Sequence, residues 1–148
     1  MADSPNDINS LDSTDLDIKS ILLLDDDIDL ADTLKMLLES RNFVVTTVKN
    51  GVEGLHEIMA FDFDIIMCDM MMPAMPGDMF YLAVQRTKPH LCKRFIFITG
   101  HSGNPKIDDF LKKVDAVVLS KPVVTDELVG AISFVMKNSQ SESEEARR

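Results

Sequence analysis

Three aspartates, one threonine and one lysine in this sequence have the side chains that phosphoryl chemistry uses. Asp25, Asp26 and Asp69 supply carboxylates, and three carboxylates brought together repel one another unless a cation joins them. Carboxylate oxygens suit Mg²⁺, whose octahedron is completed by water and phosphate oxygens. Thr99 offers a hydroxyl and Lys121 a compact positive charge, and both can bind phosphoryl oxygens. A carboxylate beside the metal is also a natural nucleophile toward phosphorus.

Asp69 ends a short apolar run, residues 65–68, and prolines follow it closely. Such a run is typical of a strand buried on both faces of a parallel sheet. Pro73 and Pro76 cannot continue a strand, and Gly77 gives the backbone freedom to turn. We therefore expect Asp69 at the carboxyl end of a central strand, where open α/β sheets bind ligands. From this stretch alone, Asp69 could equally be the N-cap of the next helix.

The rest of the chain alternates short apolar runs with amphipathic segments. The runs predict strands at residues 21–24, 43–48, 65–68, 95–98 and 116–119. Apolar residues at helical spacing predict five helices, at about residues 28–40, 52–59, 79–87, 108–113 and 126–137. This alternation is typical of the α/β class with one doubly wound parallel sheet. Each candidate side chain follows a strand, so all of them are expected at the carboxyl edge of that sheet.

The totals fit one globular domain. The 148 residues are 45% hydrophobic and 27% charged, which is ordinary for such a domain. We expect residues 1–17 to form a disordered acidic leader, residues 18–138 the domain and residues 139–148 a polar tail. The net charge of −10 disfavours direct nucleic-acid binding. Neither a signal peptide nor an 18-residue apolar run is visible, so a cytoplasmic protein without membrane spans is expected.

In order and spacing, these motifs resemble the receiver domain of bacterial two-component response regulators, over about residues 19–137. That family has an acidic pair after strand one, an aspartate before Met-Pro after strand three, Thr or Ser after strand four, and Lys-Pro after strand five. The matching residues are Asp25-Asp26, Asp69 with Met72-Pro73, Thr99, and Lys121-Pro122. Thr99 and Lys121 follow Asp69 by 30 and 52 residues, which are the family's intervals.

The resemblance implies a flavodoxin-like fold with strand order 2-1-3-4-5. It implies that Asp69 accepts a phosphoryl group from a sensor histidine kinase or a phosphotransfer protein. Such a protein catalyses only its own phosphorylation and dephosphorylation. It then signals to a downstream protein, as a monomer or as a weak dimer through the fourth helix, fifth strand and fifth helix. The implied Mg²⁺ ligands are Asp25, Asp26, Asp69 and the backbone carbonyl of Met71, and the implied phosphoryl ligands are Thr99 and Lys121.

Four positions bear on how such a site would switch and decay. Val118 stands three residues before the lysine, where the family commonly has an aromatic ring that swings inward, so backbone movement is expected here instead. Val114 replaces the glycine that commonly ends the family's fourth helix. Met71 and His101 lie two residues beyond the aspartate and the threonine, on the path of the attacking water. Because Met71 is apolar, we expect slow loss of the phosphoryl group.

Two other classes of function compete with a signalling module. A magnesium phosphohydrolase of the haloacid dehalogenase type would have Asp-x-Asp after strand one, which Asp25-Asp26-Asp27 could supply. That alternative leaves the Asp69 motif and both intervals unexplained, and Asp27 is also a good helix cap. A flavin carrier would need a phosphate-binding loop rich in Ser, Thr and Gly after strand one, and none is visible.

Overall fold

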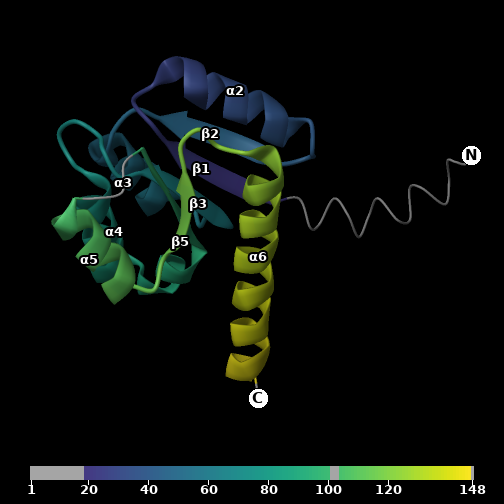
Figure 1. The fold of residues 1–148 in the computed structure, drawn as a ribbon. Coiled ribbons are helices and arrows are strands. Elements are labelled where there is room, and N and C mark those ends of the chain that lie inside the picture. Colours follow the sequence, from purple (N-terminus) through teal and green to yellow (C-terminus); the bar gives the residue numbers. More distant parts are fainter. Residues whose placement is uncertain (1–18, 101–103, 148) are drawn as a thin grey trace, which may run out of the picture.

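The computed structural model describes residues 19–100 and 104–147, with side chains up to residue 139. Its centre is a five-stranded sheet in the order β2-β1-β3-β4-β5, in which all neighbouring strands run parallel (Figure 1). The doubly wound α/β fold and the flavodoxin-like strand order are therefore confirmed. The strands are β1 (Ser20–Leu24), β2 (Val44–Val48), β3 (Ile65–Asp69), β4 (Phe95–Thr99) and β5 (Val117–Ser120).

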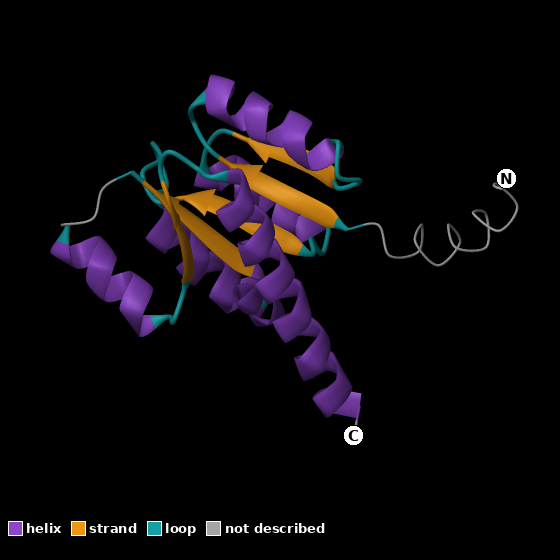
Figure 2. Cartoon of the chain, turned by 45° about the vertical axis from the view of Figure 1, so that its right-hand side comes forward, coloured by secondary structure: helices purple, strands orange, loops and turns teal. Residues whose placement is uncertain are grey.

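Helices cover both faces of the sheet (Figures 1 and 2). α2 (Ile28–Glu39) and α6 (Thr125–Arg147) lie on one face. The other face is covered by α3 (Gly51–Ala60), α4 (Gly77–Thr87) and α5 (Pro105–Lys113). The five predicted α-helices are all present in the described part of the chain. A short 3₁₀-helix, η1 (Pro89–Arg94), leads into β4 and was not expected.

Side chains alternate along the strands and fill both layers of the core. In β1, Ile21 and Leu23 belong to the layer of α2 and α6, whereas Leu22 and Leu24 belong to the layer of α3 and α4. All five residues of β3 are buried, as predicted for a central strand. Full burial of one such apolar side chain contributes about 1.5–3 kcal/mol. With both faces of the sheet covered, the polar side chains gather at its carboxyl edge.

α5 packs more loosely than its neighbours. None of its residues is buried, in contrast to α3 and α4. Its main anchor is Phe110, whose ring centroid lies 5.5 Å from that of Tyr81 and 5.7 Å from that of Phe97, both edge-on. At its end, Val114 keeps a φ of −91°, and the left-handed conformation falls on Asp115 with a φ of 54°. The missing glycine is thus replaced by an aspartate, which tolerates this conformation.

The last helix is longer than the sequence analysis predicts. An end near residue 137 was expected, but α6 continues to Arg147 and its second half runs beyond the sheet (Figure 1). Residues 138–147 contain neither glycine nor proline and are rich in helix formers, so the helix propagates without an apolar stripe. The expected leader, residues 1–17, lies outside the described residues. No helix among those described has the length and apolarity needed to cross a membrane.

Candidate functional site

The carboxyl edge of the sheet brings together the predicted site residues. β1 leads directly into Asp25 and Asp26, β3 ends at Asp69, and β4 ends at Thr99. Lys121 follows β5, and its peptide bond to the next proline is cis. Asp25 and Asp69 are only 1% and 2% exposed, so their carboxylates are held inside the protein rather than on its surface. The clustering expected from chain order is therefore present in the fold.

The Lys121 ammonium contacts both buried carboxylates. Its Nζ lies 2.9 Å from Oδ2 of Asp69 and 3.7 Å from Oδ2 of Asp25. Burial acts to lower the pKa of Lys121, but the hydrogen bond to Asp69 and the negative charges of both aspartates outweigh it and raise the pKa. Lys121 therefore stays charged beside Asp69.

Asp69 is presented to the site and does not cap a helix. Its Oδ1 accepts a hydrogen bond of 3.0 Å from the backbone N–H of Met71, within the loop that follows β3. The N-cap position of α4 is occupied by Pro76 instead. Asp27 is the residue that caps, because its carboxylate accepts from the N–H of Leu30 at the start of α2. The N-cap alternative for Asp69 is thus wrong, and Asp27 is committed to α2, which removes the Asp-x-Asp pair that a phosphohydrolase would need.

The three carboxylates fit a divalent cation. One oxygen each from Asp25, Asp26 and Asp69 lies within 4.8 Å of the other two. Oδ1 of Asp25 accepts from the N–H of Asp27 at 2.9 Å, whereas its buried Oδ2 has no hydrogen-bond partner. Desolvation by burial, helped by the charge of Asp69, raises the pKa of Asp25 to about 6. A buried oxygen without a donor, beside two further carboxylates, is what an oxygen-ligated ion such as Mg²⁺ would satisfy.

Gly77 is a supporting residue whose role the sequence did not reveal. A Cβ at this position would lie 2.9 Å from the carbonyl oxygen of Asp69 and 3.0 Å from Cα of Met70. The Gly77 N–H also donates to the carbonyl of Met70 at 3.1 Å. α4 can therefore start directly against the end of β3 only because this residue lacks a side chain. The sequence indicated a turn here, but this close approach depends on a tertiary contact that no local pattern reports.

The remaining expectations concern residues around the site. Thr99 is 9% exposed at the end of β4, and its carbonyl accepts a 2.9 Å hydrogen bond from the N–H of Lys121. The Met71 side chain is 63% exposed, so it borders the site rather than sealing it. Val118 is 38% exposed on β5. His101 lies outside the described residues, and the Met71 carbonyl as a metal ligand stays a prediction.

The fold and this site define the chain as a receiver domain. A sequence profile described as "Response regulator receiver domain" matches residues 21–133, which is most of the chain. The protein belongs to the response regulator receiver domain family. The resemblance drawn from the motifs is thereby confirmed.

Individual relatives agree with this family. The chain is 29% identical over 128 residues to the transcriptional regulatory protein GlrR of Escherichia coli, and 28% identical over 127 residues to the cell cycle response regulator CtrA of Brucella ovis. The match to GlrR covers 86% of this chain but only 28% of GlrR, and the match to CtrA covers 84% of this chain and 53% of CtrA. The chain therefore spans only part of the length of these relatives. A CheY-like receiver domain from Methanospirillum hungatei shares the fold, with a TM-score of 0.77 and 25% identity over 84% of this chain and 98% of that one.

Proposed function

We propose that this protein is a phosphorylation-dependent signalling module that accepts a phosphoryl group on Asp69 from a phosphohistidine donor. The donor would be a sensor histidine kinase or a phosphotransfer protein. The observation that carries the proposal is the pairing of Lys121 Nζ with Asp69 Oδ2 at 2.9 Å, next to two further carboxylates. This arrangement brings a nucleophile, a fixed positive charge and a possible cation site together at the carboxyl edge of the sheet.

Each residue of the site has a separate role in the proposed phosphoryl transfer. A carboxylate oxygen of Asp69 attacks phosphorus, the P–N bond to the donor imidazole breaks, and that imidazole keeps the electron pair and takes a proton. Lys121 neutralises charge on the equatorial oxygens, and the Thr99 hydroxyl can donate a hydrogen bond to one of them. Asp25 and Asp26 would hold Mg²⁺ together with Asp69, and the bound ion supplies further neutralisation of the phosphoryl oxygens. The Met71 N–H fixes the orientation of the attacking carboxylate.

Phosphorylation would be read out through α5 and β5. An aspartyl phosphate adds about −1.5 to −2 charges and new acceptor oxygens. The backbone N–H of Lys121 donates a hydrogen bond to the carbonyl of Thr99. A displacement of either residue would therefore also displace the loop that follows the other. The loop after Thr99 leads to α5, which has no buried residue to hold it in place. Without an aromatic ring at Val118, movement of this backbone carries the signal to a partner protein.

Acetyl phosphate labelling tests the assignment. With Mg²⁺, we expect one acid-stable, base-labile phosphoryl group per chain, detected by intact mass. Asp69→Asn should abolish it, whereas Asp32→Asn, which changes an exposed carboxylate of α2, should leave labelling unchanged. Full labelling of Asp69→Asn would refute the phosphoacceptor, and continuous turnover of acetyl phosphate by the wild type would indicate a hydrolase instead.

Amide exchange tests the proposed output route. Exchange of residues 104–112 should change when a phosphate mimic such as beryllofluoride is added with Mg²⁺, because α5 is the loosely held element nearest to Thr99. Residues 31–38 of α2, on the other face of the sheet, are the internal control. If both segments respond equally, or neither responds, the route through α5 is rejected.

A further inference from the structure

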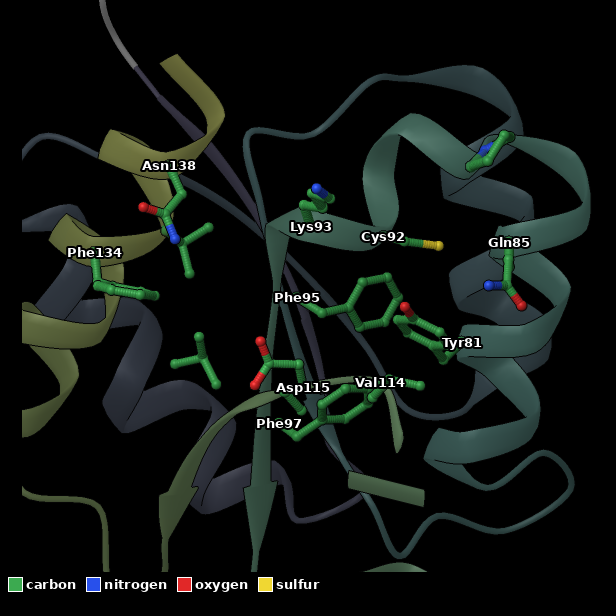
Figure 3. A pocket seen from close by; sticks show the side chains of 14 residues that line it. Tyr81, Gln85, Cys92, Lys93, Phe95, Phe97, Val114, Asp115, Phe134 and Asn138 are labelled. Atoms are coloured by element: carbon green, nitrogen blue, oxygen red, sulfur yellow. The ribbon is translucent and has the colours of Figure 1, made fainter. Parts of the chain in front are cut away.

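A groove opens at the amino edge of the sheet, at the opposite end of the strands from Asp69 (Figure 3). It has a volume of about 840 Å³ and lies between α4 and η1 on one side and α6 on the other. The first residues of β4 and β5 contribute to its floor. No residue assigned to phosphoryl transfer lines it, so the groove needs an explanation of its own.

The groove has an apolar interior and a polar rim. Tyr81 and Phe95 form an edge-on ring pair with centroids 5.0 Å apart at its base. Phe134 lines it from α6 and is 54% exposed, which is a large apolar area to leave in water. Gln85 and Asn138 stand at the rim (Figure 3). A segment that fills this groove should therefore carry a few apolar side chains among polar ones.

The wall formed by α4 and η1 is the most basic region of an acidic protein. Residues 79–94, which cover most of α4 and all of η1, contain four lysines and arginines and no aspartate or glutamate, although the whole chain has a net charge of −10. Of these basic residues, Lys93 lines the groove. Lys88 is paired with Asp62, and the Arg94 guanidinium donates to the carbonyl of Phe63. Asp115, two residues before β5, also lines the groove and would repel an anionic segment toward Lys93 of η1.

The first 18 residues of the chain have the complementary composition. They contain five aspartates and no lysine or arginine, and their central part carries Leu11 and Leu16. β1 begins at Ser20 on the same edge of the sheet as the groove, because all strands are parallel. β4 is two strands away, about 10 Å. Eighteen residues can extend about 60 Å, so this segment is long enough to reach.

We propose that residues 1–18 dock into this groove of their own chain. Leu11 and Leu16 occupy its apolar interior, covering Phe134, and the aspartates around them face the basic wall of α4 and η1. The docking is independent of the chemistry at Asp69, so neither proposal depends on the other. Tyr81 and Phe97 line the groove and also contact Phe110 of α5, so the docked segment would share these two side chains with the element proposed to carry the output.

A disulfide trap tests the docking, because the chain already has a cysteine in the groove. Cys92 lines it, whereas Cys68 is fully buried and cannot compete. Thr14→Cys places a second thiol between Leu11 and Leu16 without removing either. Oxidation by diamide, which takes up the two electrons and two protons of the thiols, should close an intramolecular bond between residues 14 and 92. Mildly alkaline buffer is needed, since burial raises the pKa of the Cys92 thiol.

The rate of disulfide closure is compared between matched variants of the Thr14→Cys protein. Replacing Leu11 and Leu16 by serine should slow ring closure at least tenfold. Replacing Met36 and Val52 by serine should leave the rate unchanged, because both are apolar and exposed and neither lines the groove. Molar salt should also slow closure, because the attraction to the basic wall is screened.

A second readout needs no engineered thiol. Leu11→Ser with Leu16→Ser, in the otherwise native chain, should speed amide exchange of residues 85–94 at least threefold. The proposal would be overturned if the disulfide closed at the same rate with and without the two leucines and amide exchange of residues 85–94 did not change. Disulfide closure by itself is not sufficient support, because an undocked tether already gives an effective thiol concentration in the millimolar range. Disulfide dimers that increase with protein concentration would overturn it in favour of a second copy of the chain in the groove.

Discussion

Replacing Asp25 by asparagine should make the metal-free protein more stable at neutral pH. Asp25 is 1% exposed, and burial raises its pKa from 3.8 to about 6. The folded state therefore binds a proton more tightly than the unfolded chain, so stability is highest below pH 4 and falls as pH rises through 4 to 6. At about 1.4 kcal/mol for each pKa unit, the cost at pH 7.5 is about 3 kcal/mol. Asparagine carries no charge and can still accept the hydrogen bond from the Asp27 N–H.

Thermal unfolding in chelator at pH 7.5 and pH 4 measures this effect. The variant should melt about 6–12 °C above the wild type at pH 7.5, and the two should converge at pH 4. Asp32→Asn, at an exposed position of α2, should stay within about 0.5 kcal/mol of the wild type at both pH values. Added Mg²⁺ should stabilise only the wild type, because the variant lacks one ligand. If the variant is less stable than the wild type at pH 7.5 in chelator, the ionised Asp25 carboxylate does not destabilise the folded protein and the argument is refuted.

Three further changes have expected outcomes. Gly77→Ala should destabilise by about 1–3 kcal/mol in chemical denaturation, because the new Cβ would meet the Asp69 carbonyl at 2.9 Å, and an unchanged midpoint would contradict that contact. Phe97→Ala should cost about 3–5 kcal/mol in the same assay, since this ring is fully buried, and a loss below 1 kcal/mol would refute the packing. Met71→Asn should shorten the lifetime of the phosphorylated protein by up to about tenfold, because a polar side chain can hold the attacking water; slower decay would reverse this argument.

The site was predictable because the carboxyl ends of parallel strands lie at one edge of the sheet, and the resemblance to the family supplied the strand order. Asp25, Asp69 and Lys121 each follow a short apolar run, and parallel strands deliver their carboxyl ends to one edge. Asp69 and Lys121 follow β3 and β5, which are separated by β4, and the long lysine side chain spans this gap to make the 2.9 Å contact. The bounds of the strands agree with the prediction to within one residue for the same reason, since polar residues or turns end each run.

Three features could not be predicted, each for a physical reason. The second half of α6 has no apolar stripe to signal a helix, and it forms by propagation from a packed first half. η1 is a single short 3₁₀ segment, which has no periodicity long enough to detect. The groove depends on the packing of α4, η1 and α6 around the starts of two strands, so its lining residues are distant in sequence. Long-range packing of this kind leaves no local pattern.

The shortness of β4 constrains any redesign of this domain. Five residues run from Phe95, in the groove, to Thr99, beside the candidate site, and they cover about 17 Å. Inserting or deleting one residue within the strand would send every later side chain to the opposite face, so Phe97 and Ile98 would exchange layers. Length changes are tolerable only before Phe95 or after Thr99. A library that varies loops at either end could therefore alter one end of the molecule without disturbing the other.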